Sequence, residues 1–108
     1  MVPTHEKNVT LALVQMSCSE QKEQNIAKAC ELISRAADMG ANSVCLQELF
    51  ATPYPSQLED HERFVWAEAI PGPTSERLQQ VAAKQKVVVI GSLFERRAAG
   101  LFHNTTVV

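Results

Sequence analysis

The feature that most constrains the fold is an alternation of strand-like and helix-like segments in the first half of the chain. Residues 9–16 (VTLALVQM) are apolar on both faces of a strand, which is typical of a buried parallel strand. In residues 21–39, apolar side chains recur at helical spacing, which indicates an amphipathic helix. Residues 43–47 (SVCLQ) indicate a second short buried strand. This order predicts a right-handed β-α-β unit with parallel strands.

The ends of the first helix carry local signals. Ser17 or Ser19 could supply its N-cap, because a side-chain oxygen there can accept a hydrogen bond from the first turn. Gly40 stands where a left-handed residue would end the helix. We therefore expect the helix to begin shortly after Ser19 and to end just before Gly40.

The second half continues the alternation. Residues 74–85 are predicted to form a helix, with Pro73 as its start signal and Leu78 and Val81 on its apolar face. Residues 87–94 (VVVIGSLF) form the most β-prone segment of the chain. Residues 98–100 predict a turn, and residues 103–108 begin a further strand. The fold class is therefore α/β, with a β-α-β-loop-α-β order.

Between the two halves, residues 49–72 lack periodicity and are punctuated by prolines. We expect a long loop that covers or serves a site, with a short helical turn near residues 59–64. Tyr54, Phe64 and Trp66 could line a pocket there. Packing against the sheet is the commoner role of such aromatic side chains.

The charge balance argues against two classes of partner. The chain has 10 basic and 12 acidic side chains and a net charge of −2, so it offers no excess of positive charge to nucleic acid or to an anionic membrane. No apolar run approaches the roughly 18 to 20 residues of a membrane span, and residues 1–8 lack the apolar core of a signal peptide. We expect a cytoplasmic protein with neither partner.

Cysteine and histidine spacing gives no sign of a metal site. Cys18, Cys30 and Cys45 are odd in number and lack a paired short spacing, and the three histidines share no ligand spacing with them. Each cysteine is expected in an apolar strand or on a helix face, as a small buried hydrophobe. We therefore expect reduced thiols, no metal, and no nucleophile among these cysteines.

Two phosphate-based functions fit poorly. The four glycines form neither the dinucleotide fingerprint nor a P-loop. A phospho-receiver domain has a similar length and β-α rhythm, but it needs acidic residues at the end of its first strand. This chain has Gln15 and Met16 there.

One side chain is the main candidate for catalysis. Glu48 follows the predicted strand 43–47, and ligands of open α/β sheets bind at the carboxyl ends of their strands. A carboxylate in such a place can serve as a general base. The plainer alternative is a surface glutamate at a strand end, and position alone does not separate the two.

Three segments in order resemble the carbon-nitrogen hydrolase family, also called the nitrilase superfamily. They are LQELFATPYP, AEAIPGPTSERL and GSLFERRAAGLFHNT, and together with the strand 9–16 they spread over nearly the whole chain. Within this family they are most similar to the amidases that act on N-carbamoylputrescine.

The resemblance implies a fold and a mechanism. The fold would be α/β, the N-terminal part of an α-β-β-α sandwich, in a parent protein that forms a homo-oligomer. The family uses a Glu-Lys-Cys triad with no metal or organic cofactor, and Glu48 stands where the family's glutamate stands. The lysine and the nucleophilic cysteine would lie beyond Val108. Residues 1–108 would then be a partial domain whose C-terminal part is missing.

The resemblance also implies a small-molecule carbamoyl-amine or amide substrate, with N-carbamoylputrescine and polyamine synthesis as the first expectation. Tyr54 is the expected substrate-binding residue. Glu59, Asp60 and Glu62 are available to a cationic amine, although acidic runs are more often solvated surface. The alternatives are another amide or ureido substrate, and an inactive truncated fragment.

Two further residues match family positions. Glu95 resembles a glutamate near the family's site and is expected either to play a structural role or to support the residues that contact the substrate. Asn104 is expected to fix a loop and the start of a strand by side-chain hydrogen bonds rather than to touch the substrate.

Overall fold

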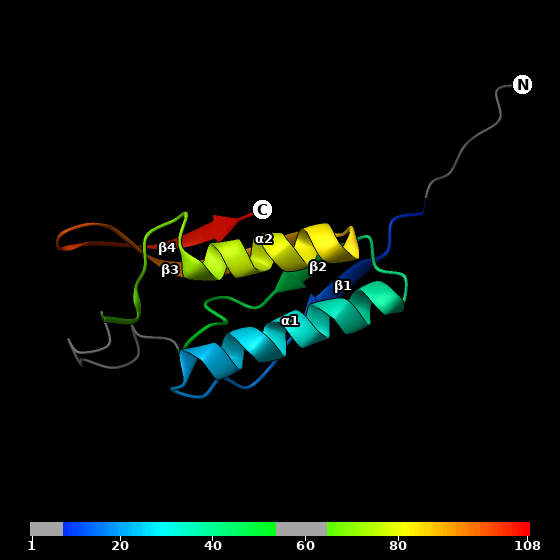
Figure 1. The fold of residues 1–108 in the computed structure, drawn as a ribbon, viewed down its shortest axis with the longest axis horizontal. Helices are drawn as coiled ribbons and strands as arrows, with labels where there is room; N and C mark the ends of the chain where they lie inside the picture. The colour runs from blue at the N-terminus through cyan, green and yellow to red at the C-terminus, as the bar shows by residue number, and fades with distance from the viewer. Residues whose placement is uncertain (1–7, 54–64) are drawn as a thin grey trace, which may run out of the picture.

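A four-stranded sheet with two helices on one face forms the fold seen in the computed structural model, which describes residues 8–53 and 65–108 (Figure 1). The strands, in their order across the sheet, are β1 (Leu11–Val14), β2 (Ser43–Leu46), β3 (Val88–Ala98) and β4 (Leu101–Val107). The helices are α1 (Lys22–Asp38) and α2 (Pro73–Gln85). The strands β1, β2 and β3 are parallel, and β4 returns antiparallel to β3. The predicted α/β order is confirmed.

The β1-α1-β2 unit has the predicted parallel pairing, and Gly40 follows α1 with a φ of 97°. The predicted serine N-cap is wrong. Gln21 occupies the N-cap position, and no side chain caps the helix from there. The Ser19 hydroxyl instead accepts a hydrogen bond from the backbone N–H of Gln21 at 3.2 Å, because Asn25 ties the Ser19 backbone to the side of the first turn.

The predicted helix 74–85 is present as α2, which begins one residue earlier, at Pro73, and buries Leu78 and Val81. The strand β3 is longer than predicted and runs to Ala98, because it pairs with β4 in a hairpin. The hairpin turns at Gly100, whose φ of 73° suits a residue without a side chain. The extra residues of β3 are held by this pairing, since they do not continue the apolar run.

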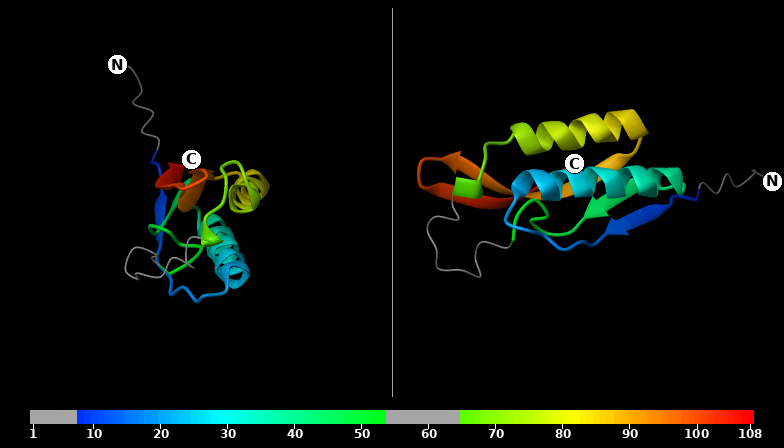
Figure 2. Two further views of the ribbon diagram at one scale, coloured as in Figure 1. Left: turned by 90° about the vertical axis from the view of Figure 1, so that its left-hand side faces the viewer. Right: turned by 60° about the horizontal axis from the view of Figure 1, so that its bottom comes forward.

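The core lies between the sheet and the helices, which cover the same face of it (Figure 2). Strand alternation directs Val44 and Leu46 of β2, with Val89 and Leu93 of β3, toward this core, and all four are buried. In the described part of the chain the opposite face of the sheet carries no helix. We call it the open face.

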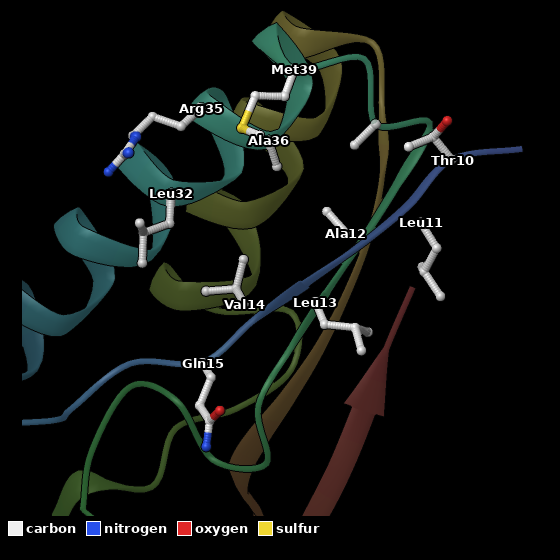
Figure 3. Close-up of a pocket in the computed structure, with 11 residues that line it drawn as sticks. Thr10, Leu11, Ala12, Leu13, Val14, Gln15, Leu32, Arg35, Ala36 and Met39 are labelled. Carbon is white, nitrogen blue, oxygen red and sulfur yellow. The ribbon is translucent and has the colours of Figure 1, made fainter.

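The prediction that residues 9–16 are buried on both faces is wrong for the open face. Ala12 and Val14 point toward α1, whereas Leu11 and Leu13 point the other way (Figure 3). Leu11 is 57% exposed and Leu13 is 76% exposed. The reason is that one layer of helices covers one face of a sheet, and β1 lies at its edge. A groove of about 440 Å³ opens between β1 and α1.

Gly91 of β3 marks a close approach of the sheet to α2. A Cβ atom at this position would lie 2.8 Å from Cδ1 of Leu78 and 3.6 Å from Cε1 of Phe50. We predict that Gly91→Val lowers the free energy of unfolding of the full-length protein by about 1–3 kcal/mol, because the core has no room for the side chain. Urea unfolding measures this loss. Adding Leu78→Ala should recover part of it, and strictly additive losses would contradict the proposed contact.

Candidate active site

Glu48 lies just beyond the carboxyl end of β2, where its side chain is exposed. It lines a shallow depression of about 300 Å³ on the open face. The other residues of this depression are Cys45, Leu46, Ile90, Gly91, Ser92, Asn104 and Thr106. The carboxylate is therefore accessible to a small molecule, at the strand end where the sequence predicts a ligand site.

A chain of hydrogen bonds joins Glu48 to the β3–β4 hairpin. The Nδ2 amide of Asn104 donates to Oε1 of Glu48, and the hydroxyl of Ser92 donates to Oδ1 of Asn104 at 2.8 Å. Asn104 makes side-chain hydrogen bonds, as expected from its position. The group that it holds, however, is the candidate catalytic carboxylate rather than a loop backbone.

Backbone and side-chain groups of the segment after β1 and of α1 fix the turn that carries Glu48. The hydrogen bonds run from the backbone N–H of Met16 to Oε1 of Gln47 (2.7 Å), from Sγ of Cys18 to the carbonyl of Phe50 (2.9 Å), and from Nδ2 of Asn25 to the carbonyl of Ala51 (2.8 Å). These bonds hold the turn on both sides of Glu48, so its place depends on the packing of α1 and β1 as well as on β2.

Leu49, the residue after Glu48, has a φ of 50° although it is not a glycine. A left-handed conformation costs such a residue roughly 1–2 kcal/mol. The Leu49 side chain is 5% exposed, so its burial offsets this cost. Backbone strain of this kind, held by the surrounding structure, is common beside functional groups.

The surroundings of Cys18 and Cys30 disfavour the thiolate form of both side chains. Burial raises the pKa of the Cys18 thiol, and nearby Lys28 offsets this only in part. Burial likewise raises the pKa of the Cys30 thiol. A protonated thiol is a poor nucleophile. The expectation that each cysteine lies in a strand or on a helix is wrong for Cys18, which lies between β1 and α1, whereas Cys45 of β2 lines the depression beside Glu48.

The expected substrate-binding residue Tyr54 lies outside the described residues. The same is true of Phe64, of the acidic side chains Glu59, Asp60 and Glu62, and of the helical turn expected near residues 59–64. Trp66 is described, and its backbone carbonyl accepts a hydrogen bond from Nζ of Lys22 at 2.8 Å.

Glu95 lies on the face of the sheet that the helices cover, and it is 8% exposed. Its Oε1 accepts a hydrogen bond from the Thr105 hydroxyl at 2.7 Å. Strand alternation places Ser92 and Asn104 on the opposite face of the same hairpin. Glu95 thus links β3 to β4 on the face that the helices cover, in keeping with a structural role.

Glu68 is a second carboxylate with a distinct role, and no local motif in the sequence singles it out. Its Oε1 accepts a hydrogen bond from the backbone N–H of Thr74 at 2.6 Å, in the first turn of α2. Its Oε2 pairs with Lys22 of α1. Burial by itself would raise the pKa of Glu68, but the hydrogen bonds from Lys22 and Thr74 outweigh it and leave the pKa lowered. Glu68 therefore caps α2 and fastens it to α1.

The backbone of Glu68 also extends the sheet. Its N–H donates to the carbonyl of Phe94 at 3.1 Å, and its carbonyl accepts from the N–H of Arg96 at 2.9 Å. Just before α2, the chain at Glu68 therefore runs beside the part of β3 that contains Phe94 and Arg96. All of α2 separates Glu68 from β3 in the sequence. No local pattern of residues could therefore have predicted this contact.

Two other kinds of site are absent from the residues that the structure describes. Within 8–53 and 65–108, no helix is both long and apolar enough to cross a membrane. Across those same two stretches, no three histidine, cysteine, aspartate or glutamate side chains come together as metal ligands would.

The chain belongs to the carbon-nitrogen hydrolase family, whose sequence profile matches residues 10–108. It is 37% identical over 95 residues to omega-amidase NIT2 of Mus musculus, and 35% identical over 106 residues to the N-carbamoylputrescine amidase of Solanum lycopersicum. The crystal structure of a carbon-nitrogen hydrolase from Helicobacter pylori G27 matches it with a TM-score of 0.78 and 30% identity. The predicted family and its α/β fold, a nitrilase-superfamily fold, are confirmed.

These matches differ greatly in how much of each protein they cover. They span 88% of this chain for the omega-amidase, 95% for the N-carbamoylputrescine amidase and 91% for the Helicobacter structure. They span only 33%, 35% and 34% of the respective relatives. The chain thus corresponds to about a third of the length of the proteins it matches.

We predict that Glu68→Gln lowers the free energy of unfolding of the full-length protein at neutral pH by about 1 kcal/mol, because a neutral amide caps α2 and pairs with Lys22 more weakly. A carboxyl group whose pKa is lowered by folding stabilises the native state above its unfolded pKa. That contribution is lost as the pH falls through the folded pKa. Denaturant unfolding from neutral to acid pH should therefore show the two proteins converging in acid. A difference independent of pH would contradict the ion pair.

Proposed function

We propose that this chain is part of an amidohydrolase that hydrolyses the C–N bond of a terminal C(=O)–NH₂ group in a small molecule, with Glu48 as the general base. The observation that carries the proposal is the placement of Glu48. Its exposed carboxylate is held by Asn104 in an open depression at the carboxyl end of a parallel strand. Membership of a family named for carbon-nitrogen hydrolysis supports this role.

The chemistry gives a glutamate a clear task. Amide and ureido carbons are poor electrophiles, so the family resemblance implies covalent catalysis by a cysteine that would follow Val108 in the whole protein. Glu48 takes the proton of that thiol, and the thiolate forms a bond to the carbonyl carbon. A lysine ammonium, also implied beyond Val108, stabilises the resulting oxyanion. The C–N bond then breaks, and Glu48 returns the proton to the departing ammonia.

The second half of the reaction uses the same base. Glu48 takes a proton from water, whose oxygen attacks the thioester carbon. The C–S bond breaks and the cysteine thiol is re-formed with the proton that Glu48 held. An amide substrate leaves as a carboxylic acid. A carbamoyl-amine leaves as a carbamic acid, which decays to carbon dioxide and the free amine. These steps require no metal or organic cofactor.

The finer proposal concerns the substrate. The tomato relative is named for N-carbamoylputrescine and the mouse relative for an omega-amide. Both kinds of molecule end in C(=O)–NH₂, so one arrangement around Glu48 suits both, and the rest of the pocket selects between them. We propose N-carbamoylputrescine, hydrolysed to putrescine in polyamine synthesis, with Tyr54 in contact with it. A linear aliphatic amide is the second candidate, and the mouse relative favours it.

The whole protein is proposed to be a cytoplasmic homo-oligomer, as the resemblance implies. It is also proposed to continue past Val108 into the segments that supply the lysine and the cysteine. The coverage of about a third of each relative supports this continuation.

We predict that Glu48→Gln in the full-length protein lowers turnover by about 10²–10⁴-fold, because the amide cannot accept the thiol proton. Ammonia release measures turnover, and the unfolding midpoint should stay unchanged. Glu68→Gln is the matched control, since it is the same substitution at a structural carboxylate. It should lower stability and keep turnover. Substantial turnover in Glu48→Gln would contradict the catalytic assignment.

We further predict that the full-length protein releases ammonia fastest, by kcat/KM, from N-carbamoylputrescine in a panel with a linear aliphatic primary amide and a β-ureido acid. Amine release by the carbamoyl-amine alone provides an independent product assay. A preference for the aliphatic amide would replace the proposed substrate while keeping the reaction. Absence of ammonia from all three would contradict the proposed function.

A further inference from the structure

We infer that Ser92 and Asn104 form a positioning relay that holds the Glu48 carboxylate for proton transfer. This inference rests on the proposed function of Glu48. The relay consists of the hydrogen bond from Ser92 to Asn104 and the bond from Asn104 to Glu48. It joins the turn after β2 to the β3–β4 hairpin, which lies far away in the sequence, on the open face.

The Asn104 amide has a defined orientation between Ser92 and Glu48. An amide group has one accepting end and one donating end. The Ser92 hydroxyl donates to Oδ1, which leaves Nδ2 facing the Glu48 carboxylate. A flipped amide would bring Oδ1 against a carboxylate oxygen, and two acceptors repel each other. The carboxylate, which only accepts, excludes the flipped amide, and the Ser92 hydroxyl supports the remaining orientation by donating to Oδ1.

The two ends of the relay differ in rigidity. Asn104 and Ser92 lie within the paired part of the β3–β4 hairpin, where Phe94 opposes Asn104 and Thr106 opposes Ser92. Glu48 lies in a turn, and its exposed side chain has several rotatable bonds. A hydrogen bond from a strand to the carboxylate restricts those rotations. Functional groups are placed most accurately when regular elements support them.

The position of the Glu48 carboxylate determines how well it can act as a base. A general base acts only within hydrogen-bond reach of the proton that it removes. A misplacement of about 1 Å can cost on the order of 10²-fold in rate. Losing the relay should therefore lower kcat, because the substrate still binds while Glu48 less often faces the thiol. A residue that contacts the substrate would instead change KM.

The experiment uses the full-length protein and its best substrate from the panel. Asn104→Ala should lower kcat by about 10- to 100-fold with KM within about twofold of its original value. Asn104→Asp is nearly isosteric and should not restore kcat, because it places an acceptor where Glu48 needs a donor. Ser92→Ala should lower kcat by a smaller factor, about 3- to 10-fold, and Ser92→Thr should restore it because the hydroxyl is kept.

Thr105→Val is the matched control. It removes a side-chain hydrogen bond from the same hairpin, but on the face that the helices cover. It should lower the unfolding midpoint and leave kcat unchanged, which separates loss of hairpin stability from loss of positioning. The midpoints of the Ser92 and Asn104 variants should stay close to that of the unchanged protein.

Three outcomes would overturn the inference. If Asn104→Ala and Ser92→Ala keep kcat while Glu48→Gln is inactive, the relay is wrong and the proposed function stands. If Asn104→Asp is as active as the unchanged protein, or if KM rises at constant kcat, Asn104 acts by packing or by substrate contact. If Glu48→Gln itself is active, both the relay and the proposed function fail.

Discussion

The burial of β2 between its neighbours and beneath the two helices is the interaction on which the arrangement depends. Val44 is fully buried and Leu46 is 6% exposed, and burial of such side chains contributes about 1.5–3 kcal/mol each. The central strand is therefore fixed relative to β1, β3 and both helices. Because Glu48 follows this strand directly, its position is set by the packing of the core and not by the preferences of an exposed turn.

The two faces of the sheet carry different kinds of polar contact. On the helix side the hairpin buries Glu95 against Thr105, and on the open face it presents Asn104 to Glu48. The period of two in a strand produces this division, because neighbouring residues must point to opposite faces. A strand that is packed on one side can therefore carry an exposed polar group at every second position without disturbing the core.

Two glutamates show how surroundings assign different roles to the same side chain. Glu68 is partly buried, paired with Lys22 and bonded to the start of α2, and these contacts lower its pKa and commit it to structure. Glu48 is exposed, and its carboxylate accepts a hydrogen bond from the neutral amide of Asn104. A charged partner and a helix end fasten the Glu68 carboxylate to both helices, whereas the Asn104 amide orients the exposed carboxylate of Glu48.

The sequence by itself determined the order of elements, the parallel β-α-β unit, the left-handed Gly40, the proline signal at the start of α2 and the place of Glu48 at a strand end. These features depend on local periodicity, on backbone geometry and on the direction of parallel strands. Only the tertiary structure decided that Leu11 and Leu13 lie on an open face, that Cys18 braces the Glu48 turn, and that Glu68 caps α2. It also decided that Asn104 holds Glu48 across 56 residues of sequence. The physical reason is that periodicity reports how one segment meets the core, whereas these contacts depend on which distant segments the core brings side by side.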